Sequence, residues 1–531
     1  MEIINQDSLV APGDLSEAPI SMTTTEANLT GSWKFFSPRF QEKASPCTRA
    51  CPIQNAIAEY MHHLNQGEQD RALEILRKTN PLPAITGRVC PRFCQQECNR
   101  LQLDQEVLIG SIERFLGDYG LDRPFPAPVE TRPERVAVVG SGPAGLAAAY
   151  FLARAGIQVT VYEKESEPGG LLRWGIPEYR LPKEVLRREL KNMVSSLKID
   201  LQCGQDLAAE GIERLLADYQ AVFCAPGLGA SILPREFAGI DQVRQGLDLL
   251  YDLQQGKIPE GRRFAVIGGG NVAVDTARSL LRHGKTVEII YRRTYAEMPA
   301  YPDEKRHLSE EGIPVQEQSL VTAVTPHPAG LRLSCHEAVS SEGAIHPGSF
   351  LFETEVDVLV LAVGQKEHLF IESRNGLYLG GDLLLGPSSV VEAMATGRQG
   401  AEAILQQLNP EPAGQTEPEP AVVGPEQINL TYVPREDPIV RSEAPVEQRQ
   451  SGFAEDDPGL SAEEAALASR RCLSCGTCTA CGLCWFFCPD VSIALDSEAE
   501  VQSVNIDPEH CKGCGLCAAV CPRGVIRMEE D

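Results

Sequence analysis

The stretch Arg135–Gly145, RVAVVGSGPAG, decides the fold of the middle of the chain. A short apolar strand runs into a turn rich in glycine, and a helical pattern follows. In such a turn the first glycine permits the tight bend, the second lets the backbone approach a pyrophosphate, and the third lets helix and strand pack closely. An anion there meets unpaired amides at a helix N-terminus. The pattern predicts a dinucleotide-binding βαβ unit whose cofactor-binding residues are Gly140, Gly142, Pro143, Ala144 and Gly145.

A carboxylate stands where this unit needs one. Glu163 ends the next strand, VTVYE, 18 residues after Gly145. At that position an acidic side chain can bind ribose hydroxyls. The glycines alone could form a plain turn, but strand, helix and acid are all in place. We expect this first site to bind FAD.

The same strand–turn–helix pattern recurs from Phe264 onward, FAVIGGG … TVEIIY, and its turn holds Gly268, Gly270, Asn271, Val272 and Ala273. Here the position equivalent to Glu163 is Tyr291, and Arg292 and Arg293 follow it. A missing carboxylate removes repulsion from a 2′-phosphate, and guanidinium groups can bind one. The second site therefore favours NADP(H), with NAD(H) as the alternative. The two arginines could instead lie in a solvated loop.

Three further stretches link these units to a known family. They are GGLLRWGIPEYRLPK (Gly169–Lys183), YRRTYAEMPAYPDE (Tyr291–Glu304) and the pair Gly381-Asp382 with the helix after it. Together with the glycine turns, they resemble the small-subunit family of NADPH-dependent glutamate synthase. Relatives in that family include the flavin half of dihydropyrimidine dehydrogenase and the large subunit of NADH-dependent ferredoxin:NADP oxidoreductase. The resemblance covers about 35–408.

The resemblance implies an NADP domain inserted within the FAD domain. It also implies that Gly381 and Asp382 touch the ribityl-phosphate of the flavin, and that Gly170 and Leu171 belong to the same site. One departure is Ala225-Pro226-Gly227, where the family usually has Ala-Thr-Gly. The flavin contact at that turn is therefore less well supported than the others.

Five cysteines near the N-terminus lie among segments with helical periodicity, as Cys47-x3-Cys51-Pro and Cys90-Pro-x2-Cys94-x3-Cys98. Their spacing suits thiolates that converge on iron–sulfur clusters, and buried inert thiols are the alternative. The resemblance implies two [4Fe–4S] clusters in this helical domain. It assigns one of them to Cys51, Cys90, Cys94 and Glu113, the last within GSIERF. Without the resemblance, Glu113 would be interpreted as a surface glutamate.

The second helical-domain cluster normally takes two ligands from an upstream Arg-Cys-Leu-x-Cys segment, which is missing before Cys47. Residues 434–475, which end in RRCLSC, look like that segment moved behind the flavin domains. Our hypothesis is that Cys472 and Cys475 fold back, in the same chain or across a homodimer, and complete a cluster with Cys47 and Cys98. Alternatively, the half-site is empty and Cys472 and Cys475 are vestigial.

The C-terminal region carries a doubled bacterial ferredoxin signature, C-x2-C-x2-C-x3-C-P. In this signature the fourth cysteine of each run ligates the other cluster. A zinc site could use CxxC pairs, but the repeated x3-Cys-Pro ending argues against zinc. The predicted ligand sets are Cys478, Cys481, Cys484 with Cys521, and Cys511, Cys514, Cys517 with Cys488.

Composition limits the function further. The chain has 531 residues, 18 cysteines and a formal net charge of −26. Nucleic acids and anionic membranes bind basic surfaces, so we expect neither as a partner. The sequence has no apolar run long enough for a membrane span and no secretory signal at its start, so we expect a cytoplasmic protein. Dense cysteine in that compartment indicates metal or redox chemistry rather than disulfides.

The predicted fold is multidomain. It has an N-terminal α-helical iron–sulfur domain, two Rossmann-like α/β domains (FAD and NAD(P)H) of the disulfide-reductase type, and a C-terminal α+β bacterial ferredoxin domain. The expected boundaries are an N-terminal arm (1–34), the helical domain (35–130), the FAD domain (131–245 and 365–408), the NAD(P)H domain (246–364), a Pro/Glu-rich extended linker (409–470) and the ferredoxin domain (471–531).

These parts suit electron transfer. A nicotinamide gives two electrons as hydride, a cluster accepts one, and flavin converts between the two. With FAD, NADP(H) and three to four [4Fe–4S] clusters, we expect an NAD(P)H:acceptor oxidoreductase that serves a partner redox protein, either a catalytic reductase or a ferredoxin. Such chains resemble the iron–sulfur flavoprotein associated with dissimilatory sulfite reductase. We identify no separate catalytic side chains. The alternatives are a glutamate synthase small subunit, which ordinarily lacks the appended ferredoxin, and a non-catalytic electron relay or scaffold.

Overall fold

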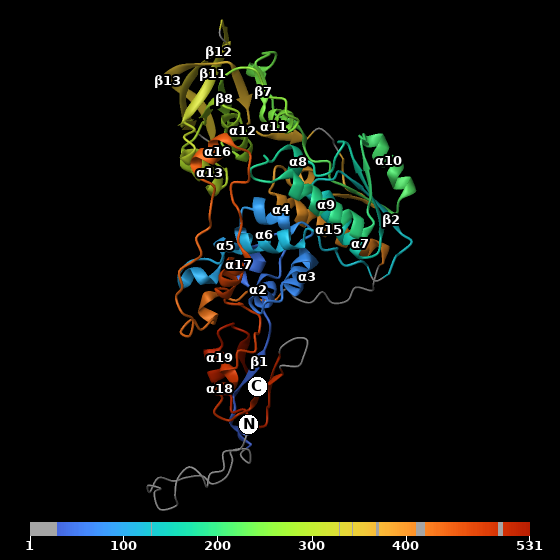
Figure 1. Cartoon of the computed structure of the whole chain (residues 1–531). Helices are drawn as coiled ribbons and strands as arrows, with labels where there is room; N and C mark the ends of the chain where they lie inside the picture. The colour runs from blue at the N-terminus through green and yellow to red at the C-terminus, as the bar shows by residue number, and fades with distance from the viewer. Residues whose placement is uncertain are drawn as a thin grey trace, which may run out of the picture. The chain divides into compact units, whose positions relative to one another are not determined.

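The computed structural model describes residues 29–128, 130–328, 330–341, 343–367, 371–409, 420–496 and 503–531 (Figure 1). The chain forms two compact units. The ferredoxin unit comprises Met1–Ala44, Pro420–Pro434 and Ser474–Asp531, and the flavin unit comprises Ser45–Glu419 and Arg435–Leu473. Most of the predicted N-terminal arm lies outside the described residues. Among the described residues, no helix combines the length and the apolar character needed to cross a bilayer.

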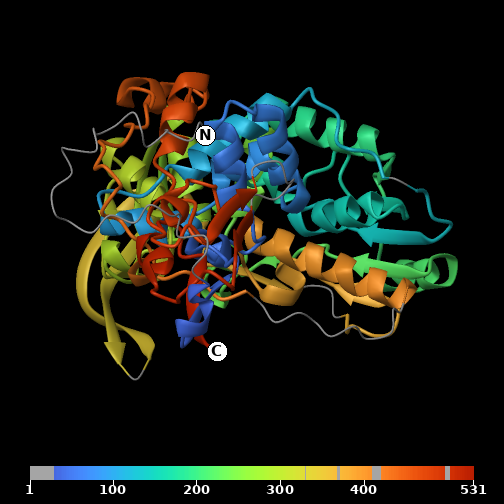
Figure 2. The same cartoon turned by 90° about the horizontal axis from the view of Figure 1, so that it is seen from below.

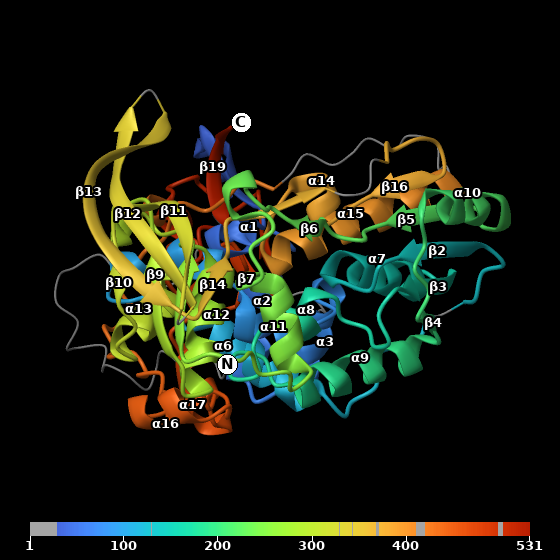
Figure 3. The same cartoon turned by 90° about the horizontal axis from the view of Figure 1, so that it is seen from above.

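The first Rossmann domain of the flavin unit contains a parallel sheet of five strands in the order β16-β5-β2-β3-β4. Helix α7 begins at the first glycine turn, and α15 packs beside it (Figure 3). The two helices can approach this closely because Gly397 of α15 has no side chain. A Cβ at that position would lie 2.1 Å from the carbonyl oxygen of Ala144 in α7. The strands are β2 (Arg135–Val139), β3 (Gln158–Glu163), β4 (Asp200–Cys203), β5 (Ala221–Cys224) and β16 (Leu377–Leu379). The helices are α7 (Pro143–Arg154), α8 (Leu171–Trp174), α9 (Lys183–Leu197), α10 (Ala209–Asp218), α14 (Asp382–Leu385) and α15 (Val390–Leu408).

The second Rossmann domain repeats this plan with a parallel sheet in the order β10-β9-β8-β14-β7. Its parallel strands are β7 (Val243–Gln245), β8 (Arg263–Ile267), β9 (Thr286–Ile290), β10 (Val315–Gln316) and β14 (Val358–Leu361). Because β7 pairs with β14, this domain starts slightly before the expected residue 246. Its helices are α11 (Gly246–Gln254), α12 (Asn271–Arg282) and α13 (Pro302–Glu310).

Antiparallel strands extend the second Rossmann domain. Figure 2 shows them in yellow as a curved ribbon. They are β11 (Ser319–His327), β12 (Gly330–Ser341) and β13 (Ala344–Val356), paired in that order. A short antiparallel pair, β6 (Gly229–Ser231) with β15 (Gln365–Glu367), lies where the chain leaves the first Rossmann domain and where it returns.

The N-terminal helical domain packs its helices through glycines. A Cβ at Gly87 of α4 would lie 2.4 Å from the amide nitrogen of Arg114 in α6, and one at Gly117 of α6 would lie 2.2 Å from the amide nitrogen of Ala84. The two helices are thus in close contact, and Cys90 directly follows α4. The helices are α1 (Pro46–Ala50), α2 (Ile57–Asn65), α3 (Gln69–Thr79), α4 (Pro83–Val89), α5 (Phe93–Gln96) and α6 (Ile109–Gly120).

Residues 435–473, which we call the strap, differ from the expected extended linker. They belong to the flavin unit and contain α16 (Val446–Ser451) and α17 (Ala462–Arg470). Helix α16 packs against α12, and α17 packs against α2 and α6 (Figure 1). The Pro- and Glu-rich composition suggested a solvated linker. The acidic side chains instead pair with arginines of the folded domains.

The strap is fastened to the second Rossmann domain by buried ion pairs. Arg278 of α12 is fully buried, and its guanidinium lies 2.6 Å from a carboxylate oxygen of each of Glu304, Glu311 and Asp456. Arg282 adds a second contact to Asp456, at 3.0 Å. Such a buried charge is stable only while its partners are in place.

The ferredoxin unit includes residues that the sequence analysis assigned to the start of the helical domain. Strand β1 (Phe36–Phe40) pairs antiparallel with β19 (Ile526–Glu530), near the C-terminus. The unit also holds the hairpin of β17 (Ile493–Asp496) with β18 (Ser503–Ile506), and the helices α18 (Leu483–Phe486) and α19 (Leu516–Val520). Each helix starts at a glycine with positive φ, Gly482 at 80° and Gly515 at 78°.

Asp456→Ala leaves Arg278 and Arg282 with one buried partner fewer. We expect the flavin unit to lose about 3–5 kcal/mol of stability, seen as a lower urea midpoint by circular dichroism. The matched control is Glu447→Ala, which removes an exposed carboxylate of the same strap and should change stability by less than about 0.5 kcal/mol. Equal midpoints for the two variants would show that the strap is not fastened through Asp456.

Candidate functional site

A cavity of about 590 Å³ lies between the two Rossmann domains of the flavin unit. One wall contains most of the residues predicted for FAD, namely Gly140, Gly142, Pro143, Ala144, Glu163, Gly170, Leu171, Gly381 and Asp382. Asn271 and Val272, at the start of α12, line the opposite wall. The atypical Pro226 and Gly227 also line this cavity.

The first glycine turn has the geometry that a dinucleotide requires. Gly140 has a φ of +93°, where a side chain would be strained, and no atom lies within 4 Å of a Cβ built on Gly142. The backbone at Gly142 is therefore open to the cavity. Gly145 has a packing role instead, since a Cβ there would lie 1.9 Å from the carbonyl oxygen of Gly140. These residues fit a pyrophosphate at the N-terminus of α7.

Glu163 is fixed in orientation at the edge of this cavity. The amide of Ser141 donates to one carboxylate oxygen at 2.8 Å, and the Ser141 hydroxyl donates to the same oxygen. The amide of Glu165 donates to the other oxygen at 2.9 Å. Glu163 is buried. A carboxylate oxygen can accept more than one hydrogen bond, so the oxygen that accepts from Glu165 keeps capacity for a ribose hydroxyl.

The second glycine turn contributes less to the cavity. Gly268 and Gly270 shape the entry into α12, and Ala273 is buried in the core. Arg292 and Arg293 follow β9, are exposed, and do not line the cavity. The structure therefore brings together the flavin residues and the start of α12, but it does not bring the two arginines to the same cavity.

Two buried polar atoms at this cavity were missed by the sequence analysis. Asp275 of α12 accepts a hydrogen bond from Arg180 at 2.6 Å, while its other oxygen has no hydrogen-bond partner among the described residues. Burial raises the pKa of Asp275. The indole nitrogen of Trp174 is also without a partner there. Both residues line the cavity, and a bound cofactor offers the donors and acceptors that they lack. The signal for Asp275 was its position one helical turn after Asn271.

Three of the four predicted ligands of the helical domain, Cys51, Cys94 and Glu113, are buried, and Cys90 is partly buried. Burial raises the pKa of Cys51 to about 11 and that of Cys90 to about 12, and it also raises the pKa of Cys94. The charge of Glu113 acts in the same direction on all three thiols. Burial raises the pKa of Glu113 itself to about 7, although Thr86 and Asn55 donate to its carboxylate at 2.6 and 2.9 Å. Thiolates and a carboxylate gathered in this way suit a cationic iron centre.

A second group of thiols lies against the same apolar core. Cys47, Cys98 and Cys472 all pack against the core that contains Cys94. The strap is held there by Arg471, whose guanidinium donates to Asp104 at 2.8 Å and whose carbonyl oxygen accepts from Arg100 at 3.2 Å. Cys472 therefore packs on the same core as Cys47 and Cys98 of the same chain. Cys475 is buried and belongs to the ferredoxin unit.

The ferredoxin cysteines gather in two small cavities of about 20 Å³ each. One cavity is lined by Cys478, Cys481, Cys484 and Cys521, and the other by Cys488, Cys511, Cys514 and Cys517. Each set contains three closely spaced cysteines and the fourth cysteine of the opposite run. This arrangement fits two cubic clusters.

The flavin cavity and the helical-domain thiols adjoin. Val89 lines the cavity, and the next residue is Cys90. A smaller cavity of about 150 Å³ is lined by Val89, Cys90, Arg180 and Tyr301, three of which also line the flavin cavity. The wall of the predicted flavin site therefore includes the neighbour of a predicted cluster ligand.

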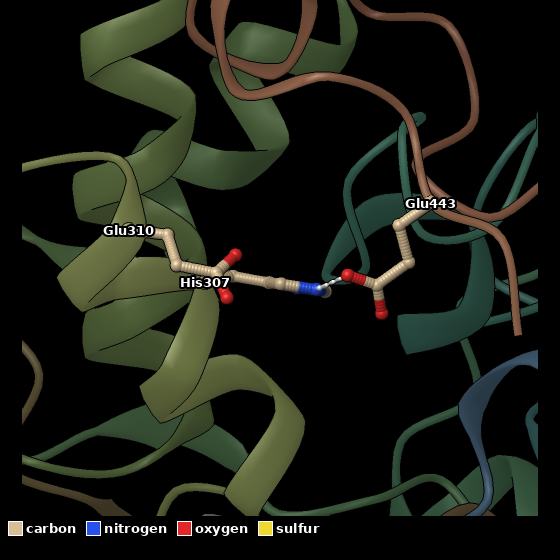
Figure 4. Close-up of side chains that lie close together, drawn as sticks. All are labelled: His307, Glu310 and Glu443. Atoms are coloured by element: carbon tan, nitrogen blue, oxygen red, sulfur yellow. Dashed lines mark hydrogen bonds and ion pairs between the residues drawn. The ribbon is translucent and has the colours of Figure 1, made fainter. Parts of the chain in front are cut away.

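A further cluster of titratable groups, His307, Glu310 and Glu443, resembles a metal site at first sight (Figure 4). Glu443 accepts from His307 at 3.2 Å, but it also accepts from Arg306 at 2.6 Å and Arg441 at 2.8 Å. Glu310 is paired with Arg306 as well. The guanidinium groups already supply the positive charge, so this group fastens the strap rather than binding a metal.

The fold and these sites define a pyridine-nucleotide-linked flavoprotein with iron–sulfur domains. Family models agree: residues 134–397 match the pyridine nucleotide-disulphide oxidoreductase family, residues 40–124 match the 4Fe-4S domain II of dihydropyrimidine dehydrogenase, and residues 477–525 match the 4Fe-4S dicluster domain.

Curated relatives narrow the assignment. The chain is 31% identical over 502 residues to the NADP(+)-dependent formate dehydrogenase subunit beta of Moorella thermoacetica, covering 81% of this chain and 70% of that one. It is 32% identical to the NAD-dependent dihydropyrimidine dehydrogenase subunit PreT homolog of Salmonella typhi, covering 68% and 91%. It is 36% identical to the NADPH-Fe(3+) oxidoreductase subunit beta of Geobacter sulfurreducens, covering 54% of this chain and 44% of the relative.

The chain therefore belongs to this family of NAD(P)H-dependent iron–sulfur flavoprotein oxidoreductases, and the resemblance drawn from its motifs is confirmed. The expected fold class is confirmed as well. The cofactors of the family's domains are FAD, a nicotinamide dinucleotide and multiple [4Fe–4S] clusters.

Glu189 of α9 links the first Rossmann domain to α4, the helix that ends at Cys90. Its carboxylate accepts from the amides of Ala84 and Ile85 at 2.9 and 3.1 Å, and burial raises its pKa to about 8. The folded chain thus keeps this proton to a higher pH than the unfolded chain does. The stability of the wild-type protein should therefore fall between about pH 4.5 and pH 8 relative to that of Glu189→Gln, because glutamine at this position does not titrate.

Thermal midpoints of the two proteins, measured from pH 5 to pH 8.5, check this expectation. The matched control is Glu184→Gln on the same helix. Hydrogen bonds from Arg187 lower the pKa of Glu184. The difference in thermal midpoint between Glu184→Gln and the wild type should therefore not change with pH above pH 5. A flat difference for Glu189→Gln too would contradict the burial argument.

Proposed function

We propose that this chain moves electrons between NADPH and a partner redox protein of the ferredoxin type, as the input or output subunit of a larger reductase complex. The observation that carries the proposal is the flavin cavity, which is bordered by both Rossmann domains and reaches Val89, beside the predicted ligand Cys90. When bound there, FAD supplies the conversion between two-electron hydride transfer and one-electron transfer.

The residues of this chain have distinct tasks in that scheme. The glycine turn before α7 holds the pyrophosphate, and Glu163 holds a ribose. Asn271 and Val272 bring the nicotinamide dinucleotide to the opposite wall of the same cavity. Arg180 keeps one oxygen of Asp275 occupied and so orients the free oxygen. Arg292 and Arg293, exposed after β9, are our candidates for contact with the 2′-phosphate.

The relatives support a partner protein, because two of them are named as beta subunits of NADP- or NADPH-dependent enzymes. The doubled ferredoxin signature supports a one-electron exit at the C-terminal domain. The dense cysteine content supports a reducing compartment, and we place the complex in the cytoplasm.

The decisive experiment titrates the anaerobic, cluster-loaded full chain with NADPH and then with NADH, following flavin and cluster absorbance. We expect substoichiometric NADPH to bleach both chromophores. Arg292→Ser with Arg293→Ser should raise the KM for NADPH roughly tenfold or more and leave NADH nearly unaffected, because only the 2′-phosphate contact is lost. If dithionite reduces both chromophores but neither nucleotide does, the chain is a relay without a working nicotinamide site.

We also propose that Cys47, Cys98 and Cys472 hold one cluster, with Cys475 as the fourth ligand that the sequence spacing assigns. The packing of Cys47, Cys98 and Cys472 against one core supports the first three members of this set. Cys472→Ser should lower the iron content by one cluster's complement and remove one EPR signal, while the ferredoxin signals persist. The matched control is Cys203→Ser, a change in β4 outside all the predicted sets. Unchanged iron in Cys472→Ser would favour the vestigial interpretation.

A further inference from the structure

Tyr60 of α2 has a buried hydroxyl that the protein does not use. The side chain is fully buried, and the hydroxyl oxygen has no hydrogen-bond partner among the described residues. Burying such a group without a partner costs free energy, so proteins rarely retain one. Two other fully buried tyrosines of the same unit behave as expected: Tyr150 donates to the carbonyl oxygen of Arg77, and Tyr179 donates to that of Asp275 at 3.3 Å.

The surroundings of Tyr60 point to what its hydroxyl would contact. Tyr60 and Cys94 belong to one apolar core, and Cys47, Cys98 and Cys472 pack against that core. Apart from burial, the groups that raise the pKa of Tyr60 are Glu113, Cys94, Cys47 and Cys51. Three of these four belong to the predicted ligand set of Cys51, Cys90, Cys94 and Glu113. Tyr60 therefore lies among groups assigned to iron–sulfur ligation.

We propose that the Tyr60 hydroxyl donates a hydrogen bond to a sulfur atom of the cluster held by Cys51, Cys90, Cys94 and Glu113, and thereby raises its reduction potential. The inference rests on the cluster site of the proposed function. A donor aimed at sulfur stabilises the additional negative charge of the reduced cluster, and hydrogen bonds to sulfur are a recognised determinant of cluster potential. Tyr60 is thus a positioning residue for electron transfer and not a ligand.

The test compares wild type with Tyr60→Phe, which removes only the oxygen. Both full-length proteins are loaded with clusters and titrated with dithionite and mediators, and each cluster is followed by EPR. We expect one N-terminal cluster to become harder to reduce, with its midpoint shifted to a lower potential. The ferredoxin clusters and the iron content should not change. Because dithionite is the reductant, this result does not depend on whether NADPH reduces the protein.

Tyr150→Phe is the matched control. It removes a fully buried tyrosine hydroxyl whose partner is a backbone carbonyl. We expect it to lower thermal stability and to leave every cluster potential unchanged. A shift of the same size in both variants would assign the effect to packing and overturn the proposal.

A second measurement tests the proposal even if Tyr60→Phe fails to take up iron. Pulsed ENDOR of the reduced wild-type protein, exchanged into D2O under unfolding and reloading, should show a strongly coupled exchangeable deuteron at the N-terminal cluster. Absence of that deuteron would overturn the proposal, as would an unchanged midpoint in fully loaded Tyr60→Phe. Wild-type protein that carries only the two ferredoxin clusters would overturn the site assignment and this inference together.

Discussion

The buried guanidinium of Arg278 is the constraint on which the flavin unit depends. It is fully buried and meets three carboxylates from two separate parts of the chain: Glu304 in α13 and Glu311 just after it, and Asp456 in the strap. A buried charge of this kind is costly unless all its partners are present, so α12, α13 and the strap must assemble together. Helix α12 starts at the second glycine turn, and the strap continues to the thiols of the helical domain. The ion pairs of Arg278 therefore connect α12, at the second glycine turn, to the strap, which also packs on the helical domain.

The same need for buried charges to be paired explains why this acidic chain has arginines in its interior. The net charge of −26 suggests a solvated, self-repelling surface, yet Glu455, Asp456 and Asp457 of the strap turn inward to pair with guanidinium groups. Interior arginines concentrate where α4, α6 and α12 meet the strap. The thiols of Cys51, Cys90 and Cys94 lie in a different environment, where burial and the charge of Glu113 raise their pKa. The buried arginines of the flavin unit are thus neutralised by carboxylates of the chain itself. The buried thiols and Glu113 lie elsewhere in the unit, and they suit a metal as predicted ligands.

Local patterns were the features that the sequence could predict. The glycine turn at Gly140 and the doubled ferredoxin signature are short, and their chemistry needs fixed spacing, so each implied its own geometry. The strap could not be predicted, because a Pro- and Glu-rich stretch has the same composition whether it is solvated or paired with distant arginines. The contribution of Gly87 and Gly117 was equally hidden, since a glycine shows its role only when a second helix lies against it. One carboxylate oxygen of Asp275 and the hydroxyl of Tyr60 have no hydrogen-bond partner among the described residues, and only the structure could reveal this.

The position of Cys472 shows why chain order is a weak constraint on a metal site. A cluster requires thiolates at fixed positions in space and is indifferent to the order in which the chain supplies them. Helix α17 packs on α2 and α6, and Arg471 is anchored to Asp104, so the strap delivers Cys472 to the core that an N-terminal segment would otherwise reach. Since that anchoring uses ion pairs and helix packing rather than the metal itself, the strap can be in place before any iron binds. A segment placed late in a chain can thus reach the core of an N-terminal domain, provided that it carries its own docking contacts.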